Sequence, residues 1–506
     1  MDREFKIIYT SDTHGHIFPV DYALKKETPG GLLALAAQTE KDGNTLILDG
    51  GDSLQGTPLS QYYIENSRDF SLHPVAESFN ALGLDYYTLG NHDFNFGYAA
   101  LRDYIRAMKA GCLCANLEDL GGELELAPWA VHTLKNGLRI GITGLVTDYV
   151  NIWEQPQNME QLRISDAFEA ASKALSEMKS LCDVTVCIYH GGFEEDLESG
   201  RLLSESGENI ACRIARELDF DILLTGHQHM AVEGLSLYGS YAVQPPANAG
   251  KYIELRAGLK ERGFWAESQL LDIGSRCLDE PRNSLLPLEE KVQLWLDRPL
   301  GCLEEEVLPE PKLWAALQGS RVAALFNLVQ LEATGADFSC TSLGNEPVGL
   351  SSPVTMRGVT AAYLFANTLV VLEVTEDVIR RCLERCAEYF ELGENGPQVS
   401  KAFLQPKVEH YNYDFYGGLN YTIDLRRPLG QRVVGLSLPD GSPLGGRKYR
   451  LCTSNYRATG TGGYELLRSC PVLWRGGIEM PDLTAMYIQK HSPVTLACPG
   501  RMEILF

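Results

Sequence analysis

Five short segments in the first half of the chain combine aspartate, asparagine and histidine directly after runs of apolar residues. The segments are Tyr9–His14, Leu48–Ser53, Leu89–Asn95, Val186–Gly192 and Thr225–His229. Their carboxylate, amide and imidazole groups are ligands for divalent transition metals. Half of the 10 histidines lie in these segments, and so many similar placements are hard to obtain by chance. The sequence therefore predicts a metal centre assembled from all five segments.

The first two segments supply carboxylates. In an extended chain, residues two apart point to the same side, so Asp12 and His14 can bind one divalent ion together. The alternative is a turn begun by Asp12, with His14 on the surface. Gly50 and Gly51 let the backbone turn tightly after a strand, so that Asp52 can approach and bridge two ions. A plain Gly-Asp turn is the alternative there.

The third segment supplies a neutral ligand and a catalytic candidate. Asn91 offers a carbonyl oxygen to a metal, whereas His92 would stand beside the ions and stabilise or protonate a leaving oxygen. The alternative is a capped helix start, with Asn91 or Asp93 as the cap.

Three further histidines, His190, His227 and His229, complete the ligand set; a lone histidine at a strand end is more often a hydrogen-bonded structural residue. Mixed His, Asp and Asn ligands without thiolates favour Zn, Mn, Fe or Co over Ca or Mg. Two such ions, typically about 3.5–4 Å apart, activate a water and neutralise phosphate oxygens. The chain has no GxxxxGK[ST] loop or GxSxG elbow, so the prediction is an enzyme that hydrolyses phosphoesters.

The composition limits the partners. A net charge of -23 opposes non-specific binding to nucleic-acid polymers, and bound metal ions are the natural source of local positive charge. No stretch of about 20 apolar residues predicts a membrane span. The 13 cysteines contain no CxxC pair, and the N-terminus lacks a signal-peptide pattern, so we expect a cytoplasmic protein, or a periplasmic or extracellular one if a signal peptide has been removed.

The first half alternates short apolar runs with helical patterns. The expected strands are Phe5–Thr10, Thr45–Leu48, Tyr86–Thr88, Arg139–Gly144, Val184–Tyr189 and Asp221–Leu224. The expected helices are Leu32–Lys41, Pro74–Leu82, Tyr98–Ala110, Ile164–Ser180 and Asn209–Glu217. This alternation predicts a largely central sheet covered by helices, with ligands at the carboxyl ends of its strands.

From about Arg276 the alternation of short apolar runs with helical patterns ends. A helix is expected over Leu285–Leu296, followed by a linker rich in proline and glutamate, and a second domain begins near Leu313. The elements expected there are helices Val322–Ala333 and Thr375–Phe390 and strands Leu369–Val374, Tyr421–Asp424, Val433–Leu438 and Tyr449–Ser454.

The five motifs together resemble those of the calcineurin-like metallophosphoesterases. Nearly the whole chain resembles the bacterial 5'-nucleotidase and 2',3'-cyclic-nucleotide 2'-phosphodiesterase/3'-nucleotidase family. The resemblance implies an α/β fold with a four-layer α/β/β/α dimetal catalytic domain over 1–275, a linker helix region over 276–312 and a smaller α/β substrate-binding domain over 313–506. It implies one ion held by Asp12, His14, Asp52 and His229, and a second held by Asp52, Asn91, His190 and His227. It makes His92 the catalytic histidine.

Two C-terminal segments, Tyr363–Leu369 and Thr453–Ala458, resemble those that form the base pocket in this family. The resemblance implies a nucleobase stacked between Phe365 and Tyr456, with Asn367 also at the substrate. Core packing is the alternative for each aromatic side chain.

Three departures from the 5'-nucleotidase pattern narrow the substrate. Asn95 stands where that pattern pairs an aspartate with the catalytic histidine, Ser342–Glu346 lacks the phosphate-binding arginine, and Thr459–Tyr464 lacks an aspartate. Arg357 could replace the arginine, or could have a surface or helix-capping role. Asn95, together with the segments Tyr411–Asp414 and Asn455–Ala458, is more similar to the 2',3'-cyclic-nucleotide 2'-phosphodiesterase/3'-nucleotidase branch. The alternatives are a 5'-nucleotidase, a hydrolase of non-nucleotide phosphate or sulfur esters, and a non-catalytic nucleotide-binding protein.

Overall fold

The computed structural model describes residues 3–203, 207–261, 263–365, 367–405, 408–497 and 499–506. Ala366, in the segment expected to carry the base pocket, lies outside the described residues. The chain forms two compact units, Met1–Gln293 and Leu294–Phe506. The division falls inside the stretch expected to be a linker, and the domain boundaries expected at the two ends of that stretch stay predictions.

Two large sheets, beside smaller two-stranded ones, form unit 1, so the single central sheet expected from the apolar runs is wrong. The seven-stranded sheet has the order β17 (Gly263–Asp272), β16 (Lys251–Lys260), β1 (Arg3–Thr10), β4 (Thr45–Asp49), β5 (Tyr86–Tyr87), β6 (Gly111–Leu113) and β8 (Leu126–Ala127). The six-stranded sheet has the order β14 (Val232–Leu237), β15 (Ser240–Gln244), β13 (Ile222–Thr225), β12 (Val184–His190), β10 (Arg139–Val146) and β9 (Trp129–Thr133). Apolar runs identify buried strands without revealing which strands pair, and the two sets of runs look alike in the sequence.

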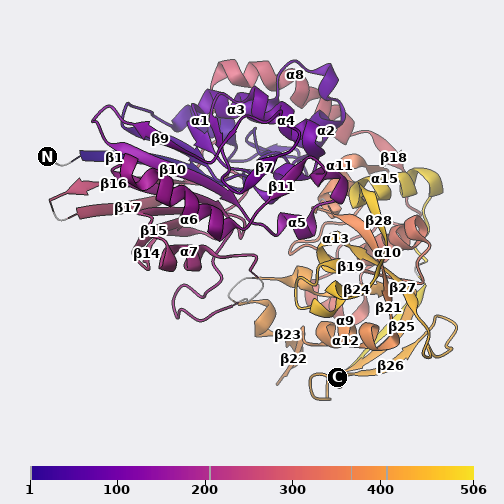
Figure 1. The fold of residues 1–506 in the computed structure, drawn as a ribbon. Coiled ribbons are helices and arrows are strands. Elements are labelled where there is room, and N and C mark those ends of the chain that lie inside the picture. Colours follow the sequence, from indigo (N-terminus) through magenta and orange to yellow (C-terminus); the bar gives the residue numbers. More distant parts are fainter. Residues whose placement is uncertain (1–2, 204–206, 262, 366, 406–407, 498) are drawn as a thin grey trace. The chain divides into compact units, whose positions relative to one another are not determined.

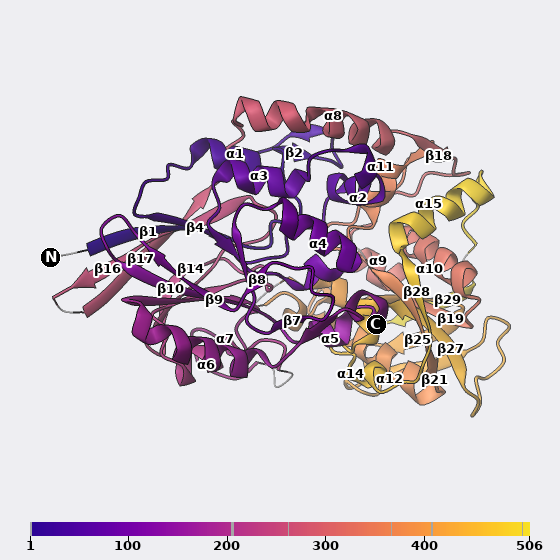
Figure 2. The same cartoon turned by 45° about the horizontal axis from the view of Figure 1, so that its top comes forward.

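The two sheets pack face to face through side chains that alternate along their strands. Ile7 and Leu46 of the first sheet share one buried cluster with Ile142, Val186 and Leu224 of the second. Because successive side chains point to opposite faces, each sheet buries its other face under helices. The covering helices are α1 (Leu32–Gln38), α3 (Pro74–Leu82) and α4 (Gly97–Ala107) on one side and α6 (Ala167–Met178) and α7 (Ala211–Glu217) on the other (Figures 1 and 2). The expected four-layer α/β/β/α arrangement is confirmed.

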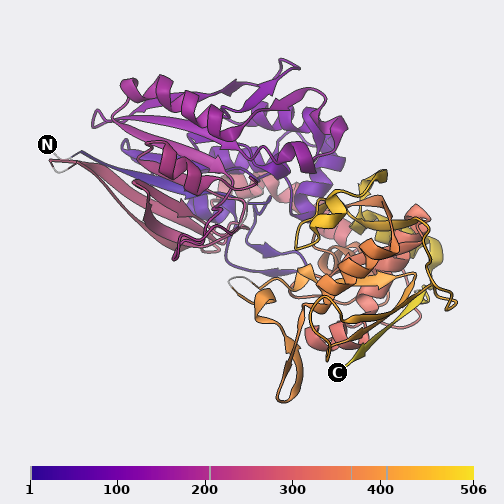
Figure 3. The same ribbon diagram turned by 60° about the horizontal axis from the view of Figure 1, so that its bottom comes forward.

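Every strand and helix expected in the first half is present, with ends shifted by a few residues. The long antiparallel hairpin of β16 and β17, which extends the first sheet beside β1 (Figure 3), is not among the expected elements. Its second strand is only partly buried, so its apolar pattern is weak. Within the described residues, no helix combines the length and apolar character needed to cross a bilayer. The 12 described cysteines are free, and the expected cellular location stays a prediction.

Unit 2 begins inside helix α8 (Asp279–Leu296), which starts earlier than the expected Leu285. Its main sheet has the order β24 (Asp414–Gly417), β19 (Phe338–Ser342), β27 (Tyr449–Ser454), β21 (Thr368–Val374) and β28 (Val472–Glu479). A smaller sheet has the order β26 (Val433–Ser437), β25 (Leu419–Asp424) and β29 (Gly500–Leu505). The expected helices appear as α10 (Arg321–Thr334) and α12 (Glu376–Ala387). The smaller α/β domain expected in the second half is confirmed.

A buried ion pair lies at one end of the main sheet of unit 2. The Nη2 atom of Arg457, in α13 (Asn455–Ala458), lies 2.9 Å from Oδ1 of Asp414, and the two side chains are 3% and 2% exposed. The guanidinium also donates to the carbonyls of Tyr411 and Thr461, at 2.9 and 2.6 Å. Arg457 therefore connects three segments of unit 2.

We expect Arg457→Leu to lower the free energy of unfolding of unit 2 by about 3–5 kcal/mol, because it leaves the Asp414 carboxylate buried without a cation. Calorimetry on the full chain measures the effect. The control is Arg381→Leu, since the ion pair of Arg381 with Asp377 is exposed and such pairs contribute at most about 1 kcal/mol. Equal transition temperatures for the two variants would contradict the expectation.

Candidate metal centre

The five motif segments all follow the carboxyl ends of strands in unit 1. Asp12 and Asp52 follow the parallel neighbours β1 and β4, whose register pairs Thr10 with Asp49. In the second sheet, the parallel register pairs Tyr189 of β12 with Thr225 of β13, and His190 ends β12. Parallel strands in register end at the same edge of a sheet, so each sheet delivers its motif residues together.

Five of the seven predicted ligands have left-handed backbone conformations. The φ angles are 55° for Asp12, 48° for His14, 57° for Asp52, 69° for His227 and 56° for His229. The extended geometry that we expected for Asp12 and His14 is therefore wrong, because β1 ends at Thr10 and the chain turns. Non-glycine residues in this conformation are strained, and such strain is concentrated at functional sites.

The first cluster contains Asp12, His14 and His229. The Nε2 atoms of His14 and His229 are 3.1 Å apart, and His229 Nε2 lies 3.4 Å from Oδ1 of Asp12. His14 Nδ1 lies 2.8 Å from the carbonyl oxygen of Gln55, which only accepts, so Nδ1 carries the proton. Burial lowers the pKa of His14 to about 4, which keeps the ring neutral and leaves a lone pair on Nε2, facing His229.

The second cluster contains Asp52, His190 and His227, with Asn91 between the two rings. His190 Nε2 lies 3.2 Å from Oδ2 of Asp52 and 3.2 Å from Oδ1 of Asn91. His227 Nδ1 lies 2.9 Å from the same Asn91 oxygen. Four side chains from four segments thus direct donor atoms to one place.

The outward nitrogens of these two rings are anchored. His190 Nδ1 donates to the carbonyl of Gly50 at 2.7 Å, and His227 Nε2 lies 3.0 Å from Oε1 of Glu208. Such partners orient metal-binding histidines and select their tautomer. Glu208 belongs to none of the five motif segments. It lies in a loop 19 residues before His227, so no sequence pattern connects the two residues.

The donor atoms fit divalent metals. In each cluster the ligand atoms lie within 4.8 Å of one another, and a buried carboxylate combines with imidazole nitrogens. For His14, His190 and His227 the other ring nitrogen is anchored. Buried carboxylates need cations nearby, and oxygen and imidazole donors without thiolate match borderline divalent ions.

The buried carboxylate of Asp93 joins two of the motif loops. Its oxygens accept backbone N–H bonds from Gly90 at 2.8 Å, Asp52 at 2.9 Å, Ser53 at 2.8 Å and Leu54 at 2.9 Å. Asp93 therefore caps the turn that contains Asn91, which was the alternative for this motif, and also fixes the loop that carries Asp52. A β-carbon on Gly90 would lie 2.1 Å from Oδ1 of Asp52, so only glycine permits this approach.

His92 lies beside the clusters. Its backbone N–H donates to Oδ1 of Asp52 at 2.7 Å, and its ring centroid is 5.5 Å from that of His14. Its Nδ1 lies 2.8 Å from Oδ1 of Asn95. The Nε2 atom is the one left for a substrate.

The residues expected to bind a base lie at one end of the main sheet of unit 2. The antiparallel register of β21 and β27 pairs Leu369 with Ser454, so the segments of Phe365 and Tyr456 adjoin the same end. Both aromatic side chains are 38% exposed, so core packing is wrong for both. The side chain of Asn367 lies nearby and donates to the Tyr363 hydroxyl at 3.4 Å.

Arg357 is buried, and its Nε donates to Oδ1 of Asp297 at 2.7 Å. The surface role considered for it is therefore wrong. A cation that sequence reasoning missed is Lys312, whose ammonium donates to the carbonyl of Gly344 in the loop that lacks the expected arginine. Burial lowers its pKa to about 8. Lys312 is distant from that loop in sequence and belongs to no motif.

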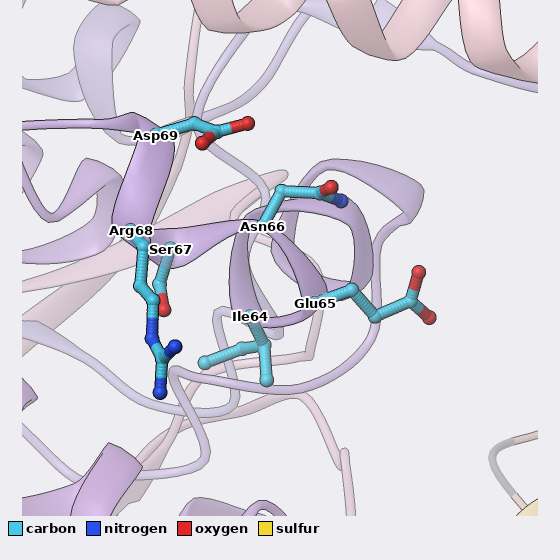
Figure 4. Close-up of a pocket in the computed structure, with 6 residues that line it drawn as sticks. All are labelled: Ile64, Glu65, Asn66, Ser67, Arg68 and Asp69. Carbon is cyan, nitrogen blue, oxygen red and sulfur yellow. The ribbon is translucent and has the colours of Figure 1, made fainter.

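A separate pocket in unit 1 contains none of the predicted site residues. It is lined by Ile64–Asp69, at the end of α2 (Pro58–Glu65) and the following turn. Figure 4 shows the Arg68 side chain pointing away from the carboxylates of Glu65 and Asp69. These three side chains do not converge on a ligand.

Comparisons with known proteins agree with this site. Residues 5–231 match the calcineurin-like phosphoesterase family, and residues 309–469 match the 5'-nucleotidase C-terminal domain. A Staphylococcus aureus protein provisionally assigned as a 5'-nucleotidase, crystallised with alpha-ketoglutarate, has the same fold with a TM-score of 0.89 at 30% identity, covering 100% of both chains. The chain is 24% identical to the Haemophilus influenzae 2',3'-cyclic-nucleotide 2'-phosphodiesterase/3'-nucleotidase over 97% of this chain and 85% of that protein. It is 26% identical to the Bacillus subtilis trifunctional nucleotide phosphoesterase YfkN over 96% of this chain and 38% of that protein, so it spans well under half of YfkN.

The fold and the site define a two-domain, metal-dependent phosphoester hydrolase. The chain belongs to the 5'-nucleotidase and 2',3'-cyclic-nucleotide 2'-phosphodiesterase/3'-nucleotidase family, with a calcineurin-like phosphoesterase domain followed by a 5'-nucleotidase C-terminal domain.

We expect Asp93→Asn to lower the free energy of unfolding by about 1.5–3 kcal/mol, because an amide NH₂ would face backbone N–H donors that now donate to a carboxylate. Urea denaturation measures this change, and the bound metal should fall in parallel because the Asp52 loop loosens. Asp103→Asn is the control, since Asp103 is exposed. Unchanged stability and metal content would show that the Asp93 bonds do not hold the loops.

Proposed function

We propose that the chain hydrolyses phosphoesters of nucleotides and prefers 2',3'-cyclic nucleotides and 3'-nucleotides. The observation that carries the proposal is the pair of clusters, Asp12–His14–His229 and Asp52–His190–His227, with His92 beside them. The neutral Asn95 at the His92 ring favours the cyclic-phosphodiesterase branch. The activities for which the Haemophilus influenzae and Bacillus subtilis relatives are named support the same class of substrate.

Two divalent ions, chosen from Zn, Mn, Co and Fe, fit the clusters. One is assigned to Asp12, His14, Asp52 and His229, and the other to Asp52, Asn91, His190 and His227. When bound, such ions supply positive charge for the phosphate oxygens and an activated water as nucleophile.

The residues of the chain orient the substrate and move a proton. His92 uses its Nε2 atom to stabilise or protonate the leaving oxygen, while Asn95 holds its Nδ1 atom. In unit 2, Phe365 and Tyr456 stack on the base, and Asn367 contacts the substrate. The guanidinium of Arg357 donates a hydrogen bond to Asp297. Arg357 would therefore bind a phosphate while it also contacts that carboxylate.

A 5'-nucleotidase is the second candidate. The Staphylococcus aureus structure with the 5'-nucleotidase assignment covers the entire chain at 30% identity, which favours this candidate. The two candidates share the metal centre and differ in which ester oxygen is the leaving group.

We expect the metal-loaded chain to hydrolyse 2',3'-cyclic AMP and 3'-AMP with a kcat/KM at least about tenfold above that for 5'-AMP, a difference of about 1.4 kcal/mol in transition-state binding. Chromatography of products after incubation with Mn, Zn or Co measures the preference. Chelation should abolish turnover, and added metal should restore it. His92→Ala, assayed in parallel, identifies any contaminating phosphatase. A preference for 5'-AMP would select the second candidate, and no hydrolysis of any nucleotide would reject both.

We expect Phe365→Ala and Tyr456→Ala each to raise the KM for nucleotides by about 5- to 150-fold, because base stacking contributes about 1–3 kcal/mol. Hydrolysis of p-nitrophenyl phosphate, which has no base, should keep its kcat/KM. Leu364→Ala is the control, since Leu364 is exposed next to Phe365. Equal losses on nucleotide and aryl phosphate would argue against a base pocket.

A further inference from the structure

A hydrogen-bonded chain of side chains leads away from His92 and ends at a carboxylate with no role in the five motifs. His92 Nδ1 lies 2.8 Å from Oδ1 of Asn95, and Asn95 Nδ2 lies 2.7 Å from Oε2 of Glu154. Glu154 follows α5 (Val150–Trp153) and is 59 residues from Asn95 in sequence. No local sequence pattern connects the two residues.

The carboxylate determines which way the Asn95 amide faces. An ionised carboxylate only accepts hydrogen bonds, so the Asn95 group facing Glu154 must be the NH₂. The other end of the amide is then the carbonyl oxygen, which also only accepts. His92 Nδ1 must therefore carry a proton and donate it. In the neutral ring this leaves the lone pair on Nε2, and in the cation it leaves an Nε2–H to donate to a leaving oxygen.

The other Glu154 oxygen is fixed independently. Its Oε1 accepts from the Gln155 backbone N–H at 2.7 Å and from Asn158 Nδ2 at 2.8 Å. Asn158 Nδ2 also donates to the backbone carbonyl of Asn95 at 3.0 Å. Both carboxylate oxygens thus face donors. A side chain at position 154 satisfies all of these donors only if it accepts hydrogen bonds at both of its terminal atoms.

The segment before Glu154 is also attached to the metal centre. The ring of Trp153 stacks on that of His227 with centroids 5.4 Å apart and an interplanar angle of 25°. The segment that carries Glu154 is therefore held against a predicted ligand on one side and against the His92–Asn95 pair on the other.

We propose that Glu154 is a positioning residue for the hydrolysis: it fixes the Asn95 amide so that His92 is oriented with Nδ1 as a donor and Nε2 toward the substrate. The proposal rests on the proposed function for the role of His92. The 5'-nucleotidase pattern has an aspartate in direct contact with the histidine. In this chain the neutral amide of Asn95 contacts the ring, and the carboxylate of Glu154 lies behind that amide. The negative charge polarises the amide and strengthens its carbonyl as an acceptor.

Exchange of the two groups tests the proposal. Glu154→Gln has the same shape, but its NH₂ faces a donor at one end or the other unless the Asn95 amide turns over and puts its own NH₂ against His92 Nδ1. The fixed acceptor for Nδ1 is then lost, so kcat for the nucleotide should fall about tenfold, part of what general acid catalysis contributes, while KM changes little. Asn95→Asp alone places two carboxylates against each other and should also lower kcat. In the double variant Asn95→Asp/Glu154→Gln, the amide NH₂ at position 154 can donate to the carboxylate at position 95, and that carboxylate still accepts from His92 Nδ1. Its kcat should therefore exceed that of both single variants.

Glu160→Gln is the matched control, since Glu160 is exposed and lies six residues further along the chain. Its kcat should equal that of the unchanged protein. A Glu154→Gln variant with unchanged kcat, or a double variant no better than the single ones, would overturn the proposal.

A second readout does not depend on catalysis. In ¹⁵N-histidine NMR spectra of the full chain, the His92 ring of the unchanged protein should show a protonated Nδ1. Glu154→Gln should reduce that signature, and the double variant should restore it. A protonated Nδ1 in all four proteins would reject the role of Glu154 even if the chain hydrolysed no nucleotide, whereas an inactive unchanged protein with the expected spectra would reject the proposed function alone.

Discussion

Hydrogen bonds from four backbone N–H groups to one buried carboxylate join two of the motif loops at the metal centre of unit 1. Asp93 accepts from Gly90 and from three consecutive residues that begin at Asp52. These bonds fix the position of the Asp52 side chain relative to Asn91 and His92, which lie in the same turn as Asp93. Burial, followed by the charge of Asp52, raises the pKa of Asp93, so the N–H groups must offset this cost for the carboxylate to stay ionised.

The same constraint explains the need for cations. Asp12, Asp52 and Asp93 are all buried, each at most 1% exposed, in a protein that carries a net charge of -23. Hydrogen bonds compensate for Asp93, but Asp12 and Asp52 face histidines of the two clusters. Carboxylates so placed are stable when ions bind between them. The left-handed backbone at five of the predicted ligands is consistent with this, because strain persists only where surrounding bonds impose it.

Some parts of this arrangement can be predicted from the sequence, and others cannot. The strands before Asp12, Asp52, His190 and His227 are apolar enough to be identified, and parallel pairing brings the ends of those strands together. The apolar runs alone did not reveal two large sheets in place of one, since buried strands of both sheets have the same composition; only the family resemblance implied the four-layer arrangement. The end of the first strand at Thr10 was expected, but the turn at Asp12 and His14 was not. Their backbone N–H groups donate to the carbonyls of Gly51 and Asp52, which belong to another motif segment. Glu154, Glu208 and Lys312 were missed for a related reason: each acts on a segment far away in sequence.

The place of the carboxylate behind His92 has an electrostatic consequence. The site already contains Asp12 and Asp52, and a phosphate substrate adds further negative charge. Interaction between charges falls with distance, so a carboxylate separated from the imidazole by the Asn95 amide repels the phosphate less than one in direct contact with the ring. The Asn95 amide still orients the ring, because its NH₂ faces only an acceptor, Glu154, and its carbonyl oxygen therefore accepts from His92 Nδ1. The chain thus obtains a fixed histidine tautomer without placing a third carboxylate against the substrate.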